Sequence, residues 1–430
     1  MNEFLPRYNK STSLILVTSY PRRTDRSVES LNAVASYADH LVPHLASNLK
    51  KTGSDLIILA EKLKGEEEVY VENDVLVIRC WERNNPAMFF SLRRVFKKLD
   101  KVKKVLYQFE FNMMGGSLIT LLFPAFLFYI RFRRKKETIL LHQVVLDIGE
   151  LGGHIGLKKG SPKSLFLNFG MNIFYRLVLS AAHHVVVHEE ILRKRLSKVS
   201  RKEIHVVSHG LGEYSGLVSE SFARERLGIA QDEFVVLCFG FITWYKGSDW
   251  VVEAFANFFR SNPEAKIKLV MAGGESANLK SHSYYHKYYE KVTEMAAQSE
   301  KIVLTGFVPD EMVPYYFAAS NVVLLPYRYQ MSASGPLALA LNFSKPFLLS
   351  TMLKETLENP DMKESLAEID IQNSELLFDL DVQDLYRKIT RLIENEELLE
   401  KMSLFADHVR KKRHWSITSQ KFIDIIYEEK

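Results

Sequence analysis

Short apolar runs that alternate with helical segments restrict the fold of this chain more than any other feature of its sequence. The runs at 13–20, 55–60 and 75–81 each predict a buried strand, and apolar residues recur at helical spacing between the first two. Buried strands that alternate with helices are typical of a parallel sheet with helices on both faces. The sequence therefore predicts an α/β fold.

The alternation stops near residues 211–220 and starts again with a second series that opens at 234–242. A chain of 430 residues also exceeds what one ordinary hydrophobic core supports. We therefore predict two Rossmann-like, doubly wound domains, at residues 1–213 and 214–405, which face each other across a cleft. The tail from Asp381 onward has a helical pattern.

The composition is that of a globular protein, with 47% hydrophobic and 25% charged residues. A net charge of +5 is too small to indicate binding to nucleic acid. Cys80 and Cys238 both lie in apolar, strand-like runs, which favours buried, reduced thiols in a cytoplasmic protein. The first residues lack the charged-then-apolar order of a signal peptide, so we expect a cytoplasmic location.

One uncharged segment, MMGGSLITLLFPAFLFYI at 113–130, reaches the lower length limit for a membrane span. The glycine pair at one end and Pro124 in the middle favour a buried helix or a helix on a membrane surface. The basic run at 131–136 is either a solvated surface or a site of attraction to anionic lipid or a phosphorylated acceptor. We therefore expect peripheral membrane contact through residues 113–136.

Ligands of doubly wound sheets bind at the carboxyl ends of the strands, so the loops after the strands form the candidate site. The loop after 234–239 contains Gly240, which allows a close turn. It also contains Lys246, which is placed to neutralise a phosphate unless it is an ordinary surface lysine. Gly273 and Gly274 follow the next strand, where paired glycines suit either close approach to a ligand or a plain turn.

The stretch Ser332–Pro336, SASGP, leads into a helix of small residues, and Pro336 suits its first turn. Backbone N–H groups and the dipole at a helix start form an anion site without a charged side chain, and the serine hydroxyls add donors. A diphosphate fits this chemistry, whereas a simple helix cap is the alternative. Since no Asp or Glu occurs between Met312 and Lys354, any chemistry here would proceed without a carboxylate from this stretch.

Further candidates also follow predicted strands. Phe307 and Val308 are expected to face the cleft in the second half of the chain. Glu110 ends the run KVLYQFE and Asp147 follows ETILLHQVV in the first half. Each of these two acids could contact an acceptor or accept its proton, and each could equally be a polar residue that closes a strand.

Other motifs do not predict a site. His183, His184 and His188 lie in one predicted strand, where residues four apart are about 13 Å apart, so no zinc site follows. The Asp-x-Asp of FDLD at 378–381 precedes the terminal helices and predicts a helix cap. The sequence contains neither a P-loop nor a Gly-x-Ser-x-Gly elbow. We predict no metal site.

From Phe234 onward, the order of these loops resembles the C-terminal domain of GT-B glycosyltransferases of family 4, which are retaining enzymes. The resemblance rests on FGFITWYKGSDWVVEAF, LVMAGG, VLTGFVPDEMVPYYFAASNVVLLPY, SASGPLALAL and KPFLLS. The first half matches more loosely, through LLHQVVLD, HHVVVHEE and IHVVSHG. The stretch RHWSITSQKFIDIIYEE resembles the family's closing helix, so residues 406–430 are expected to cross back onto the first domain.

The resemblance implies a nucleotide-diphosphate sugar bound mainly to the second domain. Lys246 and the loop Ser332–Pro336 would hold the diphosphate, and Val308 would border the base. His142 would act beside the donor sugar as a catalytic residue, whereas His209 matches a turn that we interpret as structural. The implied donor contacts are Gly240, Phe241, Thr243, Lys246, Gly273, Gly274, Val308, Arg328, Ser332, Ala333, Ser334, Gly335 and Pro336.

Two features differ from the usual family pattern. Thr243 occupies the place of an arginine that usually precedes the loop lysine, and either Arg328 or Arg176 could supply a second cation. Many members also have two glutamates in the last motif, at the positions of Ser332 and of Leu339 or Ala340 in this chain. The second glutamate normally holds the ribose hydroxyls. A subgroup with Ser-Gly at this place also lacks these acids.

We therefore predict a retaining, metal-independent glycosyltransferase of the hexosyl type. It would move a sugar from a nucleotide-diphosphate sugar to a glycan or lipid-linked acceptor in surface-polysaccharide or glycoconjugate synthesis. No cofactor is expected apart from the donor substrate, and no nucleic-acid partner. Two alternatives remain, a protein of this fold that binds a nucleotide or a partner without turnover, and a nucleotide-sugar epimerase.

Overall fold

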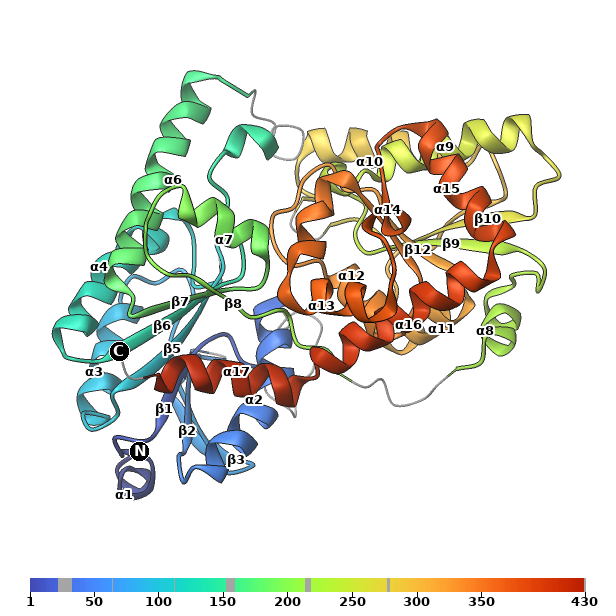
Figure 1. Cartoon of the computed structure of the whole chain (residues 1–430). Helices are drawn as coiled ribbons and strands as arrows, with labels where there is room; N and C mark the ends of the chain where they lie inside the picture. Colours follow the sequence, from blue (N-terminus) through green and yellow to red (C-terminus); the bar gives the residue numbers. More distant parts are fainter. Residues whose placement is uncertain are drawn as a thin grey trace.

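The computed structural model describes residues 1–21, 33–63, 65–111, 113–151, 159–212, 218–276 and 279–428. It contains two α/β domains that lie side by side, each built on its own sheet (Figure 1). The predicted pair of Rossmann-like domains is therefore confirmed. The predicted boundary between residues 213 and 214 lies outside the described residues.

The first sheet is built from the apolar runs of the first half. Its described strands lie in the order β3-β4-β2-β1-β5-β6-β7-β8, and neighbours are parallel except for β3 and β4. In the central strand at residues 14–17, alternate side chains enter two separate cores on opposite faces of the sheet. This arrangement explains why the whole strand is apolar. The strands are β1 (Leu14–Val17), β2 (Leu56–Glu61), β3 (Glu68–Glu72), β4 (Val75–Trp81), β5 (Lys104–Phe109), β6 (Lys136–Leu141), β7 (His184–Val187) and β8 (His205–Val206).

Helices cover both faces of this sheet. Helices α2 and α17 pack in the core that contains Leu14 and Leu16, whereas α3, α4 and α6 pack in the core that contains Ile15 and Val17. Helix α6 begins where it does because the Ser161 hydroxyl caps the helix start. The helices of this domain are α1 (Leu5–Tyr8), α2 (Ala33–Lys51), α3 (Met88–Lys98), α4 (Ser117–Phe132), α6 (Pro162–Ala181) and α7 (Glu190–Ser197).

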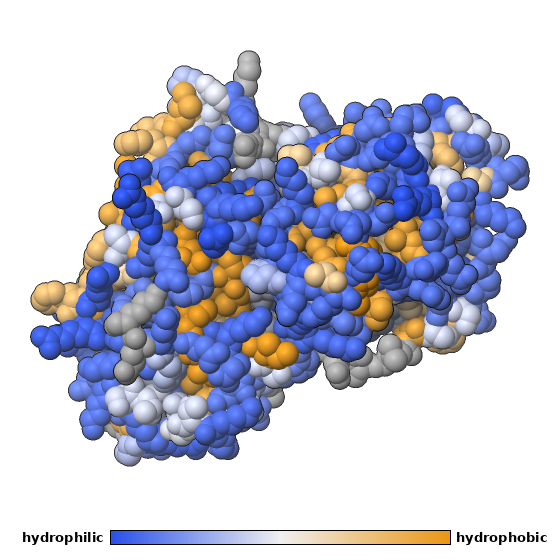
Figure 2. Space-filling model, viewed as in Figure 1, coloured by the Kyte–Doolittle hydropathy of each residue, from blue (hydrophilic) through white to orange (hydrophobic). Residues whose placement is uncertain are grey.

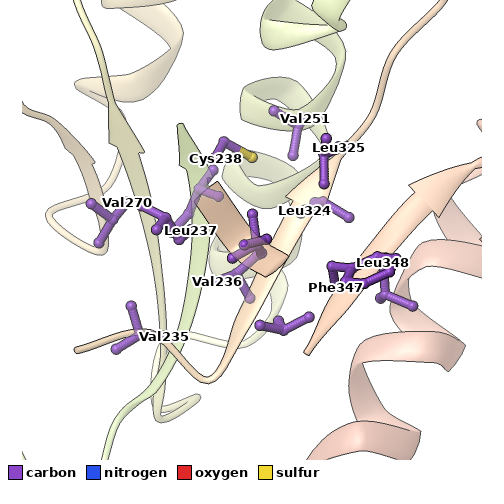
Figure 3. Packing of buried hydrophobic residues seen from close by; sticks show 14 of the residues in the cluster. Val235, Val236, Leu237, Cys238, Val251, Val270, Leu324, Leu325, Phe347 and Leu348 are labelled. Carbon is purple, nitrogen blue, oxygen red and sulfur yellow. The ribbon is translucent and has the colours of Figure 1, made fainter. Parts of the chain in front are cut away.

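The second sheet is parallel throughout its described strands, in the order β11-β10-β9-β12-β13-β14. Figure 3 shows its core, to which three neighbouring strands contribute Val236, Leu324 and Phe347. The strands are β9 (Phe234–Phe239), β10 (Ile267–Ala272), β11 (Ile302–Leu304), β12 (Val322–Leu325), β13 (Phe347–Ser350) and β14 (Leu377–Phe378).

The helices of the second domain follow its strands and complete the doubly wound arrangement. As predicted, Asp381 caps a helix, because its carboxylate accepts a hydrogen bond from the Asp384 N–H at 2.9 Å. The helices are α8 (Glu220–Leu227), α9 (Ser248–Ser261), α10 (Ser283–Ala296), α11 (Val313–Ala319), α12 (Gly335–Asn342), α13 (Pro360–Ile369), α14 (Asn373–Leu376), α15 (Val382–Glu394) and α16 (Glu396–Lys412).

Helix α17 (Trp415–Tyr427) lies on α2 of the first domain, and Asn48 of α2 donates hydrogen bonds to Ser416 and Ser419 at 2.9 Å (Figure 1). The chain thus crosses from the second domain back to the first immediately before α17. This return segment pairs with the end of the first domain, since the Leu211 N–H donates to the Arg413 carbonyl at 2.7 Å. The two crossings between the domains are therefore held side by side.

Candidate functional site

The loop after β9 positions Lys246 through two glycines with left-handed backbone conformations. Gly240 has a φ of 101° and Gly247 a φ of 73°, a region that L side chains adopt rarely. A Cβ at Gly247 would lie 2.0 Å from the Pro326 carbonyl oxygen, so no side chain fits there. These turns carry Lys246 on a short 3-10 helix, Trp244–Lys246, to the carboxyl edge of the second sheet.

Lys246, Gly240 and Pro336 come together, as the interpretation of the loops requires. A Cβ built on Gly240 would lie 2.6 Å from the Lys246 Nζ and 3.4 Å from the Pro336 Cγ, and all three residues line one small cavity. Burial lowers the pKa of Lys246 to about 8. Within the described part of the chain, no carboxylate forms an ion pair with Lys246, so this half-buried cation has a place for an anionic ligand.

The start of α12 forms the other side of this cavity. The Ser334 hydroxyl caps the helix by accepting the Leu337 N–H at 3.3 Å, and it also bonds to the Tyr327 hydroxyl at 3.1 Å. Pro336 has no N–H, and the cap already uses the N–H of Leu337. The structural cap and the anion site are thus not exclusive alternatives, because the helix start still faces Lys246.

Several of the predicted donor contacts have a structural role. Thr243 is buried, and its backbone N–H donates to the Ser248 hydroxyl at 3.3 Å. A Cβ at Gly273 would lie 2.1 Å from the Gly240 carbonyl oxygen, and a Cβ at Gly274 would lie 2.8 Å from the Phe307 nitrogen. The paired glycines therefore allow neighbouring loops to pack closely, whatever they also offer to a ligand.

Phe307 and Val308 were both expected to face the cleft, but the structure exposes only Phe307. Val308 was expected to face the cleft and border a base, but its side chain is buried in the core of the second domain. Phe307 is 60% exposed and Phe241 is 42% exposed. The exposed rings that these two loops offer are therefore those of Phe307 and Phe241, and Val308 can contribute only its backbone.

Arg328 does not extend toward Lys246 as a second cation. Its Nη1 and Nη2 atoms bind the two carboxylate oxygens of Asp249 at 2.6 and 3.0 Å, and Nη1 also donates to the Trp244 carbonyl. This pair ties the loop after β12 to the start of α9. We therefore interpret Arg328 as a residue that positions the Lys246 loop, with its guanidinium occupied by Asp249.

In the first domain, His142 follows β6 and is buried, and its Nε2 lies 3.3 Å from the Gln108 Oε1. Burial first, and then the nearby histidines, hold the pKa of His142 well below its usual range, so the imidazole is neutral. Its ring centroid lies 4.9 Å from that of Tyr37 and 5.0 Å from that of His188. His142 is thus one member of a buried polar cluster at the carboxyl edge of the first sheet.

Sequence reasoning missed most of this cluster. His209, interpreted from the sequence as structural, lies 4.9 Å from Tyr37 and 5.5 Å from Trp415 of α17, measured between ring centroids. The Tyr37 hydroxyl and the His188 Nε2 have no hydrogen-bond partner within the described chain. Buried polar atoms normally have partners, so this cluster offers bonds to a ligand. Only the recurrence of histidines at strand ends signalled it in the sequence.

The two acidic candidates of the first domain differ in their surroundings. Asp147 accepts hydrogen bonds from the Gly149 N–H and the Asn168 side chain, both at 2.8 Å, so its carboxylate holds a loop against α6. Glu110 follows β5 and is half-buried, and burial raises the pKa of its carboxyl group. Glu110 is therefore the better candidate for a proton acceptor.

The candidate loops of the two domains touch. Gln143, next to His142, forms a β-bridge with Ser332 of the SASGP stretch. Arg195 of α7 secures this contact, because its Nη1 donates to the Val144 carbonyl at 3.0 Å and to the Gln330 carbonyl at 2.7 Å. The first-domain histidine loop and the start of α12 therefore belong to one site between the domains.

A separate histidine pair lies at the other edge of the first sheet. His184 groups with His205 and Glu428, and their ligand atoms lie within 4.8 Å of one another. From the sequence, we considered only the histidines within one predicted strand, at 183, 184 and 188. We did not predict a group formed by residues from separate segments. Because His184 starts β7, the group lies at the amino ends of the strands, away from the site between the domains.

Part of the second domain is similar to known proteins in sequence. Residues 233–395 match the family described as Glycosyl transferases group 1. The mannosylfructose-phosphate synthase of Agrobacterium fabrum is 26% identical over 136 residues, and the D-inositol 3-phosphate glycosyltransferase of Corynebacterium aurimucosum is 30% identical over 106 residues. These matches cover 31% and 25% of this chain, and the chain spans only 29% and 24% of the two relatives.

Solved structures match over nearly the whole chain. The sucrose-phosphate synthase of Thermosynechococcus elongatus has a TM-score of 0.68 at 15% identity, with 96% of this chain and 98% of that chain covered. Anabaena HepE in complex with UDP and glucose has a TM-score of 0.59 at 13% identity, with 96% and 99% covered. The chain therefore has the GT-B fold, and its residues 233–395 match the Glycosyl transferases group 1 family.

Proposed function

We propose that this protein is a retaining, metal-independent glycosyltransferase that moves a hexose from a nucleotide-diphosphate sugar to a glycan or lipid-linked acceptor. The observation that carries the proposal is the position of Lys246, a half-buried cation without a carboxylate partner in the described chain, beside the start of α12. A diphosphate supplies the negative charge that this arrangement lacks. The name of the Anabaena relative, which includes UDP and glucose, makes UDP-glucose the first donor to test.

The transfer needs no acid from the protein in this scheme. The bond between the sugar C1 and the diphosphate oxygen breaks, and a bond from C1 to the acceptor oxygen forms on the same face. The acceptor's proton moves to the departing phosphate oxygen. Lys246 and the first-turn N–H groups of α12 stabilise the negative charge that grows on the leaving diphosphate, which is the main electrostatic demand of the step.

We propose that the neutral imidazole of His142 binds the sugar and not the nucleotide. We expect His142→Ala to lower kcat by about 10- to 100-fold with little change in UDP affinity, since losing a buried hydrogen-bond partner costs about 1–3 kcal/mol. Steady-state kinetics and UDP titration measure the two quantities. His282→Ala, at an exposed histidine, is the control. Equal losses of kcat and UDP affinity would place His142 at the nucleotide instead.

The affinity for UDP is expected to fall as the pH rises above about 8. Burial lowers the pKa of Lys246 from 10.5 to about 8. The side chain in the unliganded protein therefore loses its charge at a lower pH than an exposed lysine does. The terminal phosphate of UDP, with a pKa near ~6, stays ionised in this range. Calorimetric titration of UDP across this range measures the effect, which Lys246→Met should remove. A constant wild-type affinity would argue against a role for the Lys246 charge.

A screen of nucleotide sugars separates the proposal from its alternatives. Nucleotide sugars are ranked by thermal shift and then incubated with glycan and lipid-linked acceptors, with product analysis. A glycosylated acceptor with the donor's anomeric configuration supports the proposal. Binding without turnover would indicate a nucleotide-binding protein, and the absence of an acid in the α12 loop is consistent with that alternative. An epimerised nucleotide sugar would indicate an epimerase.

The acceptor and the location are further parts of the proposal. We propose that the protein acts in the cytoplasm in surface-polysaccharide or glycoconjugate synthesis, in peripheral contact with a membrane. Glu110 supports an acceptor site at the carboxyl edge of the first sheet, because it is half-buried at the loop that leads into α4. Transfer to a lipid-linked acceptor in vesicles, compared with a soluble glycan, tests this part.

A further inference from the structure

Two neighbouring helices of the first domain expose apolar side chains where a soluble protein normally exposes polar ones. Leu121 and Phe132 of α4 are 69% and 84% exposed, and Phe166 and Phe169 of α6 are 75% and 66% exposed. In α6, Phe166, Phe169 and Ile173 lie three and four positions apart. In α4, Leu121, Phe128 and Phe132 lie seven and four positions apart, so each set follows one side of its helix. We call this surface the α4–α6 face and define it by Leu121, Phe128, Phe132, Phe166, Phe169 and Ile173.

The two stripes belong to one surface. Helices α4 and α6 pack against each other, and Arg131 near the end of α4 donates to the Ser180 carbonyl near the end of α6 at 2.6 Å. Figure 2 shows hydrophobic atoms along the outer margin of the first domain, where Figure 1 places these two helices. Exposed apolar side chains that cluster on one surface of a globular domain indicate a contact with another molecule or a membrane.

The charges on this face are all positive. Neither α4 nor α6 contains Asp or Glu, and their charged residues are Arg131, Lys163 and Arg176. Arg133 and Arg134, which follow α4, are exposed and add to the same sign. Since a twofold dimer through this face would bring like charges together, a second copy of the chain is a poor partner. An anionic lipid surface matches both the apolar stripes and the charge.

The face also begins near the candidate site. Helix α4 follows the loop after β5 that contains Glu110, and both α4 and α6 precede strands of the parallel sheet, so both helices start on the side where those strands end. The carboxyl edge of the sheet is the edge that carries His142. A lipid surface on the α4–α6 face would therefore lie next to the entrance for a lipid-linked acceptor.

We propose that the α4–α6 face docks the protein on anionic bilayers as an interfacial surface. Among the described residues, no helix combines the length and the apolarity that a membrane crossing needs, so the helices would lie in the plane of the headgroups. The inference adds α6 to the segment 113–136 that the sequence indicated. Its test does not depend on the donor or on turnover.

Co-sedimentation with vesicles tests the proposal. The wild-type chain is expected to bind phosphatidylcholine vesicles that contain phosphatidylglycerol, and to bind pure phosphatidylcholine more weakly. The triple variant Leu121→Ser, Phe166→Ser, Phe169→Ser should bind the anionic vesicles at least tenfold more weakly. The matched control Phe222→Ser, Ile393→Ser, Leu404→Ser removes exposed apolar residues of the second domain and should bind like the wild type.

Two further measurements keep the test decisive. Melting curves should agree for all three proteins, because every substituted residue is exposed, and the single variant Phe166→Ser replaces the triple variant if it does not fold. Equal vesicle binding by the wild type and the triple variant would overturn the proposal. So would a wild-type dimer in sedimentation equilibrium that the triple variant converts to a monomer, since the face would then be an interface between copies.

Discussion

Replacing Lys246 with alanine is expected to reduce sugar transfer by about 100- to 1,000-fold, the loss typical of one preorganised donor at a developing oxyanion. The reason is that Lys246 is the cation beside the Gly240 turn and the start of α12, while Arg328 is bound to Asp249. The loss should appear in kcat as well as in kcat/KM, because the charge on the leaving diphosphate grows in the transition state. Initial rates with the best donor of the screen measure it.

The same variant should keep or gain stability. Burial lowers the pKa of Lys246, which means that the folded protein bears a cost for holding this charge. A melting temperature equal to or above that of the wild type, together with lost transfer, would separate function from folding. Lys287→Ala, at an exposed lysine of α10, should change neither property. Transfer at the wild-type rate by Lys246→Ala would refute the proposed mechanism.

The part of this site that sequence reasoning predicted depends on one topological rule. Loops that follow parallel strands meet at one edge of the sheet, so Lys246, after β9, and Pro336, after β12, had to be neighbours once both strands were recognised. The glycines added the rest, since Gly240 and Gly247 require left-handed turns that only a tight loop uses. Order along the chain was sufficient for these residues.

The residues that were misjudged depend on pairings between distant segments. Arg328 resembled a second cation because its partner, Asp249, lies 79 residues away in sequence. Val308 and Phe307 differ by one position, and local twist decides which of the two enters the core. The cluster around Tyr37 is formed by α2, three strand ends and α17, so no local pattern could reveal it.

Only half of the α4–α6 face could be predicted from the sequence. The uncharged segment at 113–130 was visible as a run of apolar residues. Helix α6 was not, because Asn168, Gly170 and Asn172 interrupt its apolar pattern. Only the fold shows that its exposed side also carries apolar residues, and that α6 packs against α4.

The largest effect on stability is expected at the crossing between the domains, where Asp361 of α13 pairs with Arg413. Both side chains are almost fully buried, with exposures of 6% and 3%, and the Ser208 hydroxyl of the first domain donates to the same carboxylate at 2.9 Å. Asp361→Ala would leave the Arg413 guanidinium buried without its carboxylate. We expect this variant to lower the free energy of unfolding by about 3–5 kcal/mol, as loss of one partner of a buried pair does.

The pH dependence gives this prediction a second signature. Burial alone would raise the pKa of Asp361, but Arg413 and Ser208 outweigh it and hold the pKa below 3.8. A depressed carboxyl pKa contributes stability above the unfolded-state value, and this contribution is lost as the pH falls through the folded-state value. The gap in stability between the wild type and Asp361→Ala should therefore narrow in acid, which urea unfolding at neutral pH and near about pH 3 measures.

An exposed ion pair close by provides the matched control. Glu358 pairs with Lys363 at 2.7 Å, but these side chains are 36% and 59% exposed. Glu358→Ala should therefore cost less than about 1 kcal/mol. Equal losses for the two variants would mean that the buried pair is not what holds the crossing. A large loss for Asp361→Ala alone would instead show that this carboxylate joins three parts of the chain: α13, the return segment before α17 and the end of the first domain. The Asp361 carboxylate would then help to set how the two domains face each other at the site.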